Sequence, residues 1–145
     1  MVKSGAQVHL SRCVLRGNGA ETAEYGTKHA VWVQGAGSSV QVVASLIAEN
    51  AGGAIMGTLG ARMQILRSNI TNHTVGAVGG GNSIGIFLDD AGTSCRIEGS
   101  VISHNGWARD ANGDATLKGG GVQVSSGASL TILDSTVAFN YAQWH

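Results

Sequence analysis

Proline is absent from this chain of 145 residues, and charged and aromatic residues are scarce, at 12% and 5%. A chain so poor in charge fits neither a coiled coil nor a charged disordered tail. Lysine plus arginine equals aspartate plus glutamate, nine each, so no electrostatic footprint for nucleic acid or an anionic membrane surface is expected. No run of 18 or more apolar residues occurs, so no membrane-spanning helix is predicted.

Glycine, in contrast, is abundant, with 23 residues, and it marks the start of a frame that recurs five times. After each glycine come two apolar residues in alternation, then a small residue, an aliphatic residue and usually asparagine. The copies begin at Gly5, Gly37, Gly60, Gly92 and Gly127. A fixed internal spacing, with variable material only between copies, is typical of a solenoid.

Each copy contains the period-two alternation of short strands that have one buried and one exposed face. The first run contains the apolar pairs Val8/Leu10, Val40/Val42, Met63/Ile65, Cys95/Ile97 and Leu130/Ile132. The second pairs a small with an aliphatic residue, at Cys13/Leu15, Ser45/Ile47, Ser68/Ile70, Ser100/Ile102 and Ser135/Val137. A third run precedes each later glycine, at 31–33, 54–56, 86–88 and 122–124. The pattern predicts one all-β domain over residues 1–145, a parallel β-helix of about five rungs with three short strands each.

The distance between successive frame glycines is 32, 23, 32 and 35 residues, and the shortest value is the bare rung. The longer copies carry insertions at one place, between the asparagine and the third strand, at 19–29, 74–83 and 106–119. Insertions on one side of a solenoid commonly build its binding surface.

Asparagine occupies the same place in four copies, as Asn18, Asn50, Asn105 and Asn140, and His73 takes that place in the third. Stacked amides can hydrogen-bond to one another along the axis, and asparagine tolerates the left-handed backbone of a tight turn. His73 is interpreted as a turn residue of similar size rather than as a functional imidazole.

The two cysteines, Cys13 and Cys95, belong to copies one and four. At about 4.8 Å per rung, three steps separate them by about 14 Å, whereas a disulfide needs Cα atoms within about 7 Å. Both are interpreted as small buried hydrophobes, which leaves the redox compartment open.

The run from Gly119 to Asn140, GGGVQVSSGASLTILDSTVAFN, resembles a consensus repeat of the right-handed parallel β-helix superfamily. That superfamily includes pectate-lyase-like enzymes and repeat regions of bacterial surface proteins. The resemblance covers nearly the whole chain. It implies a right-handed solenoid and an extracellular or cell-surface location, and it specifies no activity.

The middle residues of the third run are predicted to point outward, as a column of Trp32, Ile55, Phe87 and Gln123. Three large apolar residues on consecutive rungs form a patch that water should not contact. The insertions, a second subunit or a sugar chain could cover it, and the sequence leaves these alternatives open. Trp32, Ile55, Phe87 and Trp107 are the predicted binding or interface residues.

A second group is similar to the catalytic set of polygalacturonase-like glycosidases, which combine an aspartate pair, a nearby histidine and an Arg-Ile-Lys stretch. The counterparts are Asp89, Asp90 and His104, with Arg-Ile-Glu at 96–98; Glu98 stands where the family has lysine. Paired carboxylates can divide acid and base roles, although adjacent aspartates are also typical of turns. These residues carry the alternative hypothesis, a polysaccharide lyase or glycoside hydrolase.

The longest insertion contains Asp110, Asn112 and Asp114 in alternation, like the first ligands of a calcium loop. The downstream glutamate of such a loop is missing, so a solvated turn is favoured and no cofactor is predicted.

Neither end of the predicted solenoid shows a polar cap, and open ends expose core and strand edges. We therefore expect a homo-oligomer, or a flanking β-helix if the chain is a fragment of a longer solenoid. The favoured hypothesis is a non-catalytic β-helix module, acting as a rigid spacer or as a binding surface for a carbohydrate or a protein.

Overall fold

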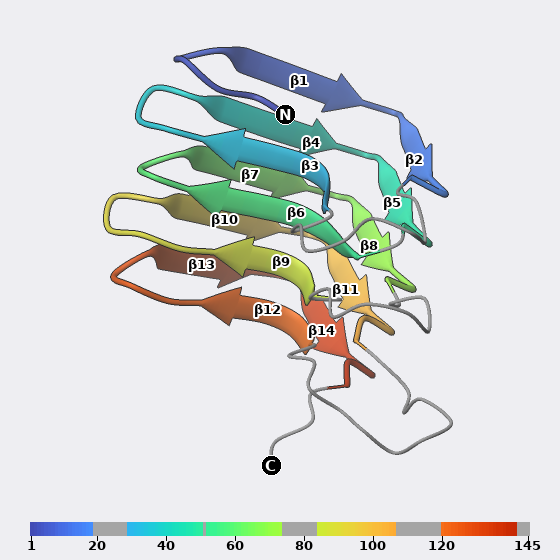
Figure 1. The fold of residues 1–145 in the computed structure, drawn as a ribbon. Helices are drawn as coiled ribbons and strands as arrows, with labels where there is room; N and C mark the ends of the chain where they lie inside the picture. The colour runs from blue at the N-terminus through green and yellow to red at the C-terminus, as the bar shows by residue number, and fades with distance from the viewer. Residues whose placement is uncertain (19–28, 51, 74–83, 107–119, 142–145) are drawn as a thin grey trace, which may run out of the picture.

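The computed structural model describes residues 1–18, 29–50, 52–73, 84–106 and 120–141, which contain 14 strands and no helix. The strands form three parallel sheets, and the strands of each sheet follow one another along a common axis (Figure 1). The first sheet contains β1 (Gln7–Ser11), β4 (Ser39–Val43), β7 (Arg62–Leu66), β10 (Ser94–Glu98) and β13 (Ser129–Leu133). The second contains β2 (Val14–Arg16), β5 (Leu46–Ala48), β8 (Asn69–Thr71), β11 (Val101–Ser103) and β14 (Thr136–Ala138). The third contains β3 (His29–Gln34), β6 (Gly53–Thr58), β9 (Ile84–Leu88) and β12 (Gly120–Val124).

Equivalent residues of successive copies lie directly opposite one another. In the first sheet Val42 lies between Leu10 and Ile65, and Ile97 lies between Ile65 and Ile132. Every described pairing is parallel and joins one rung to the next, so the predicted all-β solenoid is confirmed. The first rung has no full third strand among the described residues. Instead, the N–H of Val2 donates to the carbonyl of Trp32 at 2.7 Å, beside the edge of β3.

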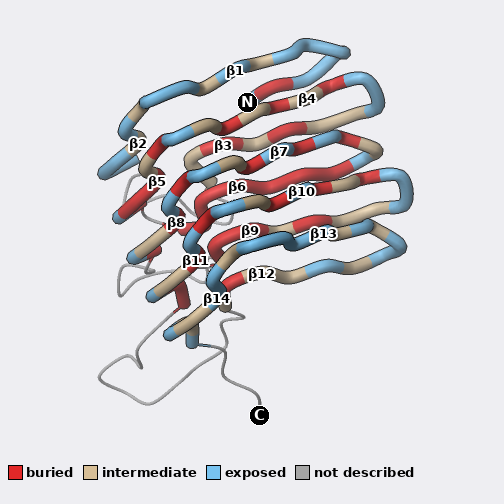
Figure 2. The backbone as a smooth tube through the Cα atoms, turned by 180° about the vertical axis from the view of Figure 1, so that it is seen from behind, coloured by how far each residue is buried: buried red, intermediate tan, exposed pale blue. Residues whose placement is uncertain are grey.

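The core consists of apolar columns along the stack, and Figure 2 shows that the buried residues lie mainly in the middle rungs. Members in the middle rungs are completely buried, among them Val42, Ile65 and Ile97 from the first sheet and Ile47, Ile70 and Ile102 from the second. Burying one such side chain contributes about 1.5–3 kcal/mol. Cys95 belongs to the neighbouring interior column of the first sheet, with Val40, Met63 and Leu130, and burial raises the pKa of its thiol to about 12. Cys13 is half-buried, and both thiols are free.

A ladder of small residues joins the rungs at the corner between the first and second sheets. The N–H of Ser45 donates to Oγ of Ser68 at 3.1 Å, and the N–H of Ser68 donates to Oγ of Ser100 at 3.1 Å. The pattern begins at Cys13, whose N–H donates to Ser45 at 3.0 Å, and ends at Ser135. Each rung therefore donates an N–H forward and accepts one from the rung before it, which gives the ladder a direction.

The asparagine column forms a second ladder with the same direction, and His73 fits into it as an amide would. The N–H of Asn50 donates to Nδ1 of His73 at 3.3 Å, while Nε2 of His73 donates to the carbonyl of Ile47 at 3.1 Å. In the next rung Asn105 accepts from the N–H of His73 at 3.3 Å and donates to the carbonyl of Ile70 at 3.1 Å. A neutral imidazole thus supplies one acceptor and one donor in place of a carboxamide. His73 is fully buried, and this burial lowers its pKa, against the opposing effect of the two backbone hydrogen bonds.

The third sheet shows that the predicted outward position of Ile55 is wrong. Ile55 pairs with Val31 and Ile86 in the interior and has no exposed surface, so it does not face outward. The outward column is instead Trp32, Met56, Phe87 and Gln123. The prediction was wrong by one residue of register. The last inward-facing residue of β6 is Gly57, which pairs with Val33 and Leu88. Only two residues separate Gly57 from Gly60. A glycine was not recognised as a core position because it has no side chain, but Met63 fills the space that a Cβ on Gly57 would take.

Candidate binding surface

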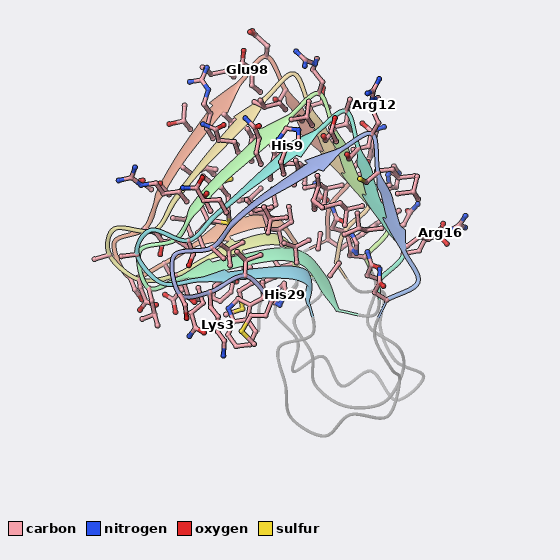
Figure 3. All side chains as sticks on the ribbon, turned by 90° about the horizontal axis from the view of Figure 1, so that it is seen from above. Lys3, His9, Arg12, Arg16, His29 and Glu98 are labelled. Atoms are coloured by element: carbon pink, nitrogen blue, oxygen red, sulfur yellow. The ribbon has the colours of Figure 1, made fainter. Side chains whose placement is uncertain are left out.

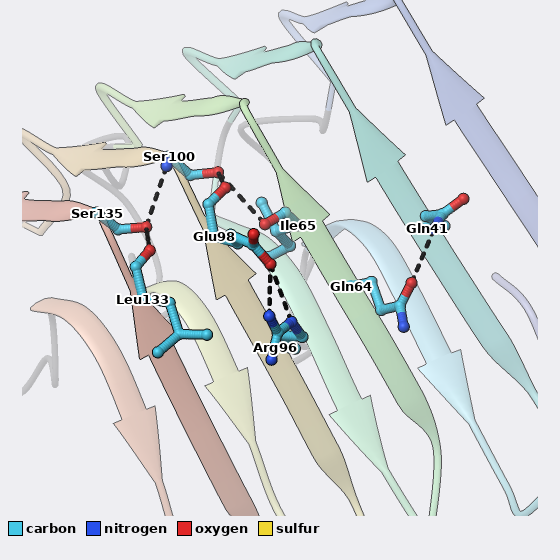
Figure 4. Close-up of polar contacts among 8 residues, drawn as sticks. All are labelled: Gln41, Gln64, Ile65, Arg96, Glu98, Ser100, Leu133 and Ser135. Carbon is cyan, nitrogen blue, oxygen red and sulfur yellow. Dashed lines mark hydrogen bonds and ion pairs between the residues drawn. The ribbon is translucent and has the colours of Figure 1, made fainter.

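The outward residues of the first sheet form a hydrogen-bonded row of polar side chains. The register places His9, Gln41 and Gln64 side by side on consecutive strands. Nδ1 of His9 lies 2.7 Å from Oε1 of Gln41, and Nε2 of Gln41 donates to Oε1 of Gln64 at 2.8 Å. An amide oxygen can only accept, so His9 donates through Nδ1–H and the row runs in one direction, from His9 to Gln64. Figure 4 shows the Gln41–Gln64 step.

An open groove of about 480 Å³ lies over this row. Six of its eight lining residues have polar side chains, and apolar atoms also contribute to its surface. The residues come from three adjacent strands, namely Gln7, Val8 and His9 of β1, Ser39, Val40 and Gln41 of β4, and Arg62 and Gln64 of β7. The row uses one N–H of the Gln41 amide and none of the Gln64 amide, which leaves further donors on two residues that line the groove. Such a surface can hydrogen-bond a polar chain laid across the strands.

Arg62 gives this groove a positive charge, whereas Ser94 holds the equivalent place on the next rung. Arg96, which lies beside Gln64 on that rung, is paired with a carboxylate. Nη2 of Arg96 lies 2.6 Å from Oε2 of Glu98 on the same strand, so these two charges offset each other. The other ion pair found among the described residues joins Arg16 to Glu49, on the second sheet and the turn after it. Neither pair involves Arg62, so its guanidinium is free of carboxylate partners within the described part of the chain.

The residues predicted to form an apolar patch lie on a different sheet. Trp32 and Phe87 point outward from the third sheet but are half-buried, and Met56 between them is only 8% exposed. Nε1 of Trp32 lies 3.4 Å from Oγ1 of Thr58, at the end of the neighbouring strand. Trp107 lies outside the described residues. What covers this column therefore stays a prediction.

The predicted catalytic residues occupy two separate corners of the solenoid. Asp89 and Asp90 lie in the turn that joins β9 to β10, at the left in Figure 1, whereas His104 follows β11 on the right. Oδ2 of Asp90 accepts from the N–H of Leu59 at 3.0 Å, and Asp90 has a φ of 73°, so it serves the turn. His104 stacks on Phe139 with ring centroids 5.2 Å apart.

The Asp89 carboxylate accepts hydrogen bonds from serine hydroxyl groups. Oγ of Ser125 donates to Oδ1 of Asp89 at 2.8 Å. Hydrogen bonds from Ser126 and Ser125 lower the pKa of the Asp89 carboxyl below its ordinary value. A carboxyl that remains ionised at neutral pH is unsuited to act as a general acid.

The weak calcium prediction at Asp110, Asn112 and Asp114 lies outside the described residues. Within the part of the chain that the structure describes, no three His, Cys, Asp or Glu side chains gather as metal ligands. No helix long and apolar enough to cross a membrane occurs in the same residues.

The groove on the first sheet was missed as a site, although its signal was present in the sequence. The outward positions of the first run are polar in every copy, as His9, Gln41, Gln64, Arg96 and Thr131. A polar outer face is ordinary for a half-exposed sheet, so the pattern did not distinguish a binding row from a solvated one.

Comparison with known proteins defines the family. A family model described as a right-handed β-helix region matches residues 1–143. Neither a curated protein nor a solved structure matches the chain significantly.

Proposed function

The chain belongs to the family of right-handed β-helix regions, and from this premise we propose that it is a non-catalytic module that binds a polysaccharide along the outer face of β1, β4 and β7. The observation that carries the proposal is the directional row from His9 through Gln41 to Gln64, with its groove. Because each side chain is oriented by its neighbour, the free donors are fixed before a ligand arrives, which lowers the entropy cost of binding.

The rigid stack supports a chain-like ligand rather than a compact one. Successive strands present equivalent side chains about 4.8 Å apart, so three strands offer a row of roughly 10 Å. Sugar hydroxyl groups both donate and accept hydrogen bonds, which suits amide side chains. Arg62 favours a polymer that carries carboxylate or sulfate groups over a neutral one.

The test is binding of neutral and acidic oligosaccharides by calorimetry, with variants of the row. Gln41→Ala removes the central amide and breaks both contacts of the row, so we expect binding about 2- to 10-fold weaker. Gln123→Ala is the matched control, since it removes the same side chain from the outer face of the third sheet. Equal loss in the two variants, or no binding by the unmodified chain, would refute the proposal.

A second arm separates binding from catalysis. The same oligosaccharides are incubated with the protein while reducing ends and unsaturated uronate absorbance are followed. We expect no turnover. Cleavage that disappears in Asp90→Asn would instead establish the enzyme hypothesis and assign it to the β9–β10 turn.

A further inference from the structure

The last rung of the stack exposes side chains that are buried in every middle rung. Ile132 is 40% exposed, whereas Ile97 and Ile65 of the same column have no exposed surface. Val137 is 45% exposed, whereas Ile102 directly above it is fully buried. The two interior columns of these sheets therefore end on an apolar face formed by β13 and β14, and Val124 of β12 adds a 41% exposed side chain.

At the opposite, N-terminal end of the stack, the same columns begin with similar apolar side chains. Val8 and Leu10 hold the places of Leu130 and Ile132, and Leu15 holds the place of Val137. These N-terminal side chains are half-buried. Between neighbouring rungs, the lower surface of one rung packs on the upper surface of the next. Each end of the molecule thus exposes one of these two surfaces.

The direction of the two polar ladders makes these halves complementary rather than identical. Each rung donates N–H groups to the side chains of the following rung, as Ser100 does to Ser135 at 3.0 Å and Asn105 to Asn140 at 3.0 Å. Among the described residues, no rung follows Ser135 and Asn140 to accept their N–H groups. The first rung carries the acceptor side of the ladders, through the Asn18 amide and the Cys13 thiol.

At the turns between the sheets, equivalent residues of the last and first rungs are complementary in charge and in size. Asp134 holds the place that Arg12 holds in the first rung, with φ values of 46° and 53°, and both are exposed. Arg12 points away from the stack in Figure 3. At the next corner Phe139 is 73% exposed, whereas Gly17 in its column has open space where a Cβ would stand. Within the chain, the column pairs Phe139 with His104 as stacked rings.

Phe139 keeps most of its surface uncovered at this end, although its ring stacks on His104 of the same chain. Its φ is 55°, close to the values of Glu49 and His104 in the same column, so the left-handed backbone belongs to this turn in every rung. A ring placed over a glycine of a neighbouring rung would be covered.

From the matched columns we propose that the C-terminal end of one molecule docks on the N-terminal end of a second copy, so that the first and second sheets continue across the junction. Asp134 then faces Arg12 of the next copy, Phe139 covers Gly17, and Ile132 and Val137 stack on Leu10 and Leu15. Because the two surfaces differ, this contact is heterologous and extends to chains of molecules.

Complementation of two blocked variants tests the proposal. Phe139→Asp blocks the C-terminal end and Gly17→Asp blocks the N-terminal end, and aspartate tolerates the left-handed backbone at both positions. By sedimentation velocity, we expect association of each variant alone to be at least about tenfold weaker than that of the unmodified chain. A mixture of the two contains one intact pair of ends and forms one-to-one dimers. Val101→Asp, on the outer face of β11, is the control that leaves association unchanged.

Two outcomes overturn the proposal. If Gly17→Asp associates normally while Phe139→Asp does not, the C-terminal ends pair with each other instead. If the unmodified chain is monomeric up to millimolar concentration, no second copy occupies this end.

Charge reversal checks the register of the junction independently. Asp134→Arg and Arg12→Asp each bring like charges together, and we expect each to weaken association about two- to fivefold at low salt. The column already accepts both residue types, at Arg67 and Asp134, so the fold tolerates the exchange. Combining the two reversals in one chain restores association; failure of the combination to do so contradicts the register.

Discussion

Ile97 and Ile132 occupy the same position of neighbouring rungs and pair with each other directly. Ile97 nevertheless has no exposed surface, whereas Ile132 is 40% exposed. Their local sequences follow the same frame, and both lie in strands of the first sheet. The difference is that Ile97 has a rung on each side and Ile132 has a rung on one side only among the described residues. Burial in this fold is therefore supplied by neighbours along the axis, and the middle and end rungs should respond differently to the same substitution.

The largest difference is expected for truncation of the core columns. Ile97→Ala leaves a cavity between two rungs and should lower the free energy of unfolding by about 2–5 kcal/mol. Ile132→Ala removes a side chain that already contacts water, and at low protein concentration we expect a loss of about 1 kcal/mol. Urea unfolding followed by circular dichroism measures both; equal losses would mean that the end rung is as well covered as the middle.

The asparagine ladder should show the next largest difference. Asn105 is fully buried and serves both adjacent rungs, so Asn105→Ala leaves the His73 N–H without its acceptor and removes the side-chain hydrogen bond to the Ile70 carbonyl. We expect a loss of about 2–4 kcal/mol from the unpaired His73 N–H and the lost side-chain hydrogen bonds. Asn18→Ala is the end-rung counterpart. Asn18 is exposed and its side chain donates to Asn50 alone among the described residues, so the substitution should cost about 1 kcal/mol or less. A similar cost for the two variants in urea unfolding would contradict the ladder.

The serine ladder sharpens the comparison at a smaller scale. Ser68→Ala removes the acceptor of the Ser45 N–H and should cost about 1–3 kcal/mol. Cys13 begins the same ladder and accepts no N–H from another rung within the described residues, so Cys13→Ala should change the free energy of unfolding by less than about 0.5 kcal/mol. Thermal unfolding of the two variants side by side would show whether the column position or the residue type sets the cost.

The smallest expected effect is a dependence on pH from His73. The imidazole has an ordinary pKa of 6.5, and burial lowers it in the folded state. Below about pH 6.5 the unfolded chain therefore binds a proton that the folded chain does not. The free energy of unfolding is fully retained above that pH and falls by at most about 1.4 kcal/mol per pH unit until the folded pKa is reached.

His73→Asn should remove this dependence, because asparagine supplies the same acceptor and donor without titrating. His104→Asn, which replaces an exposed imidazole of the next rung, is the matched control and should leave the dependence in place. A pH profile unchanged by His73→Asn would show that other groups govern acid stability.

The sequence was sufficient to predict the stack, because strand alternation and the glycine frame repeat without interruption in the first two sheets. It failed at Ile55, since Gly57 contributes a core position without a side chain and the turn before Gly60 is shorter than was assumed. His73 was correctly assigned to the asparagine column, but its two hydrogen bonds could be seen only once the rungs were placed against each other. The groove residues were visible as a polar column, but no rule of periodicity separates a hydrogen-bonded row from a solvated one.

Hydrogen exchange of the strands at two protein concentrations tests most directly the claim that each rung is protected by its neighbours and that the C-terminal rung binds a second copy. The account predicts slow exchange across β10 at both concentrations, and exchange across β13 that is fast in dilute solution and slows as the protein is concentrated. Equally fast exchange across β13 at both concentrations, or exchange across β10 as fast as across β13, would contradict it.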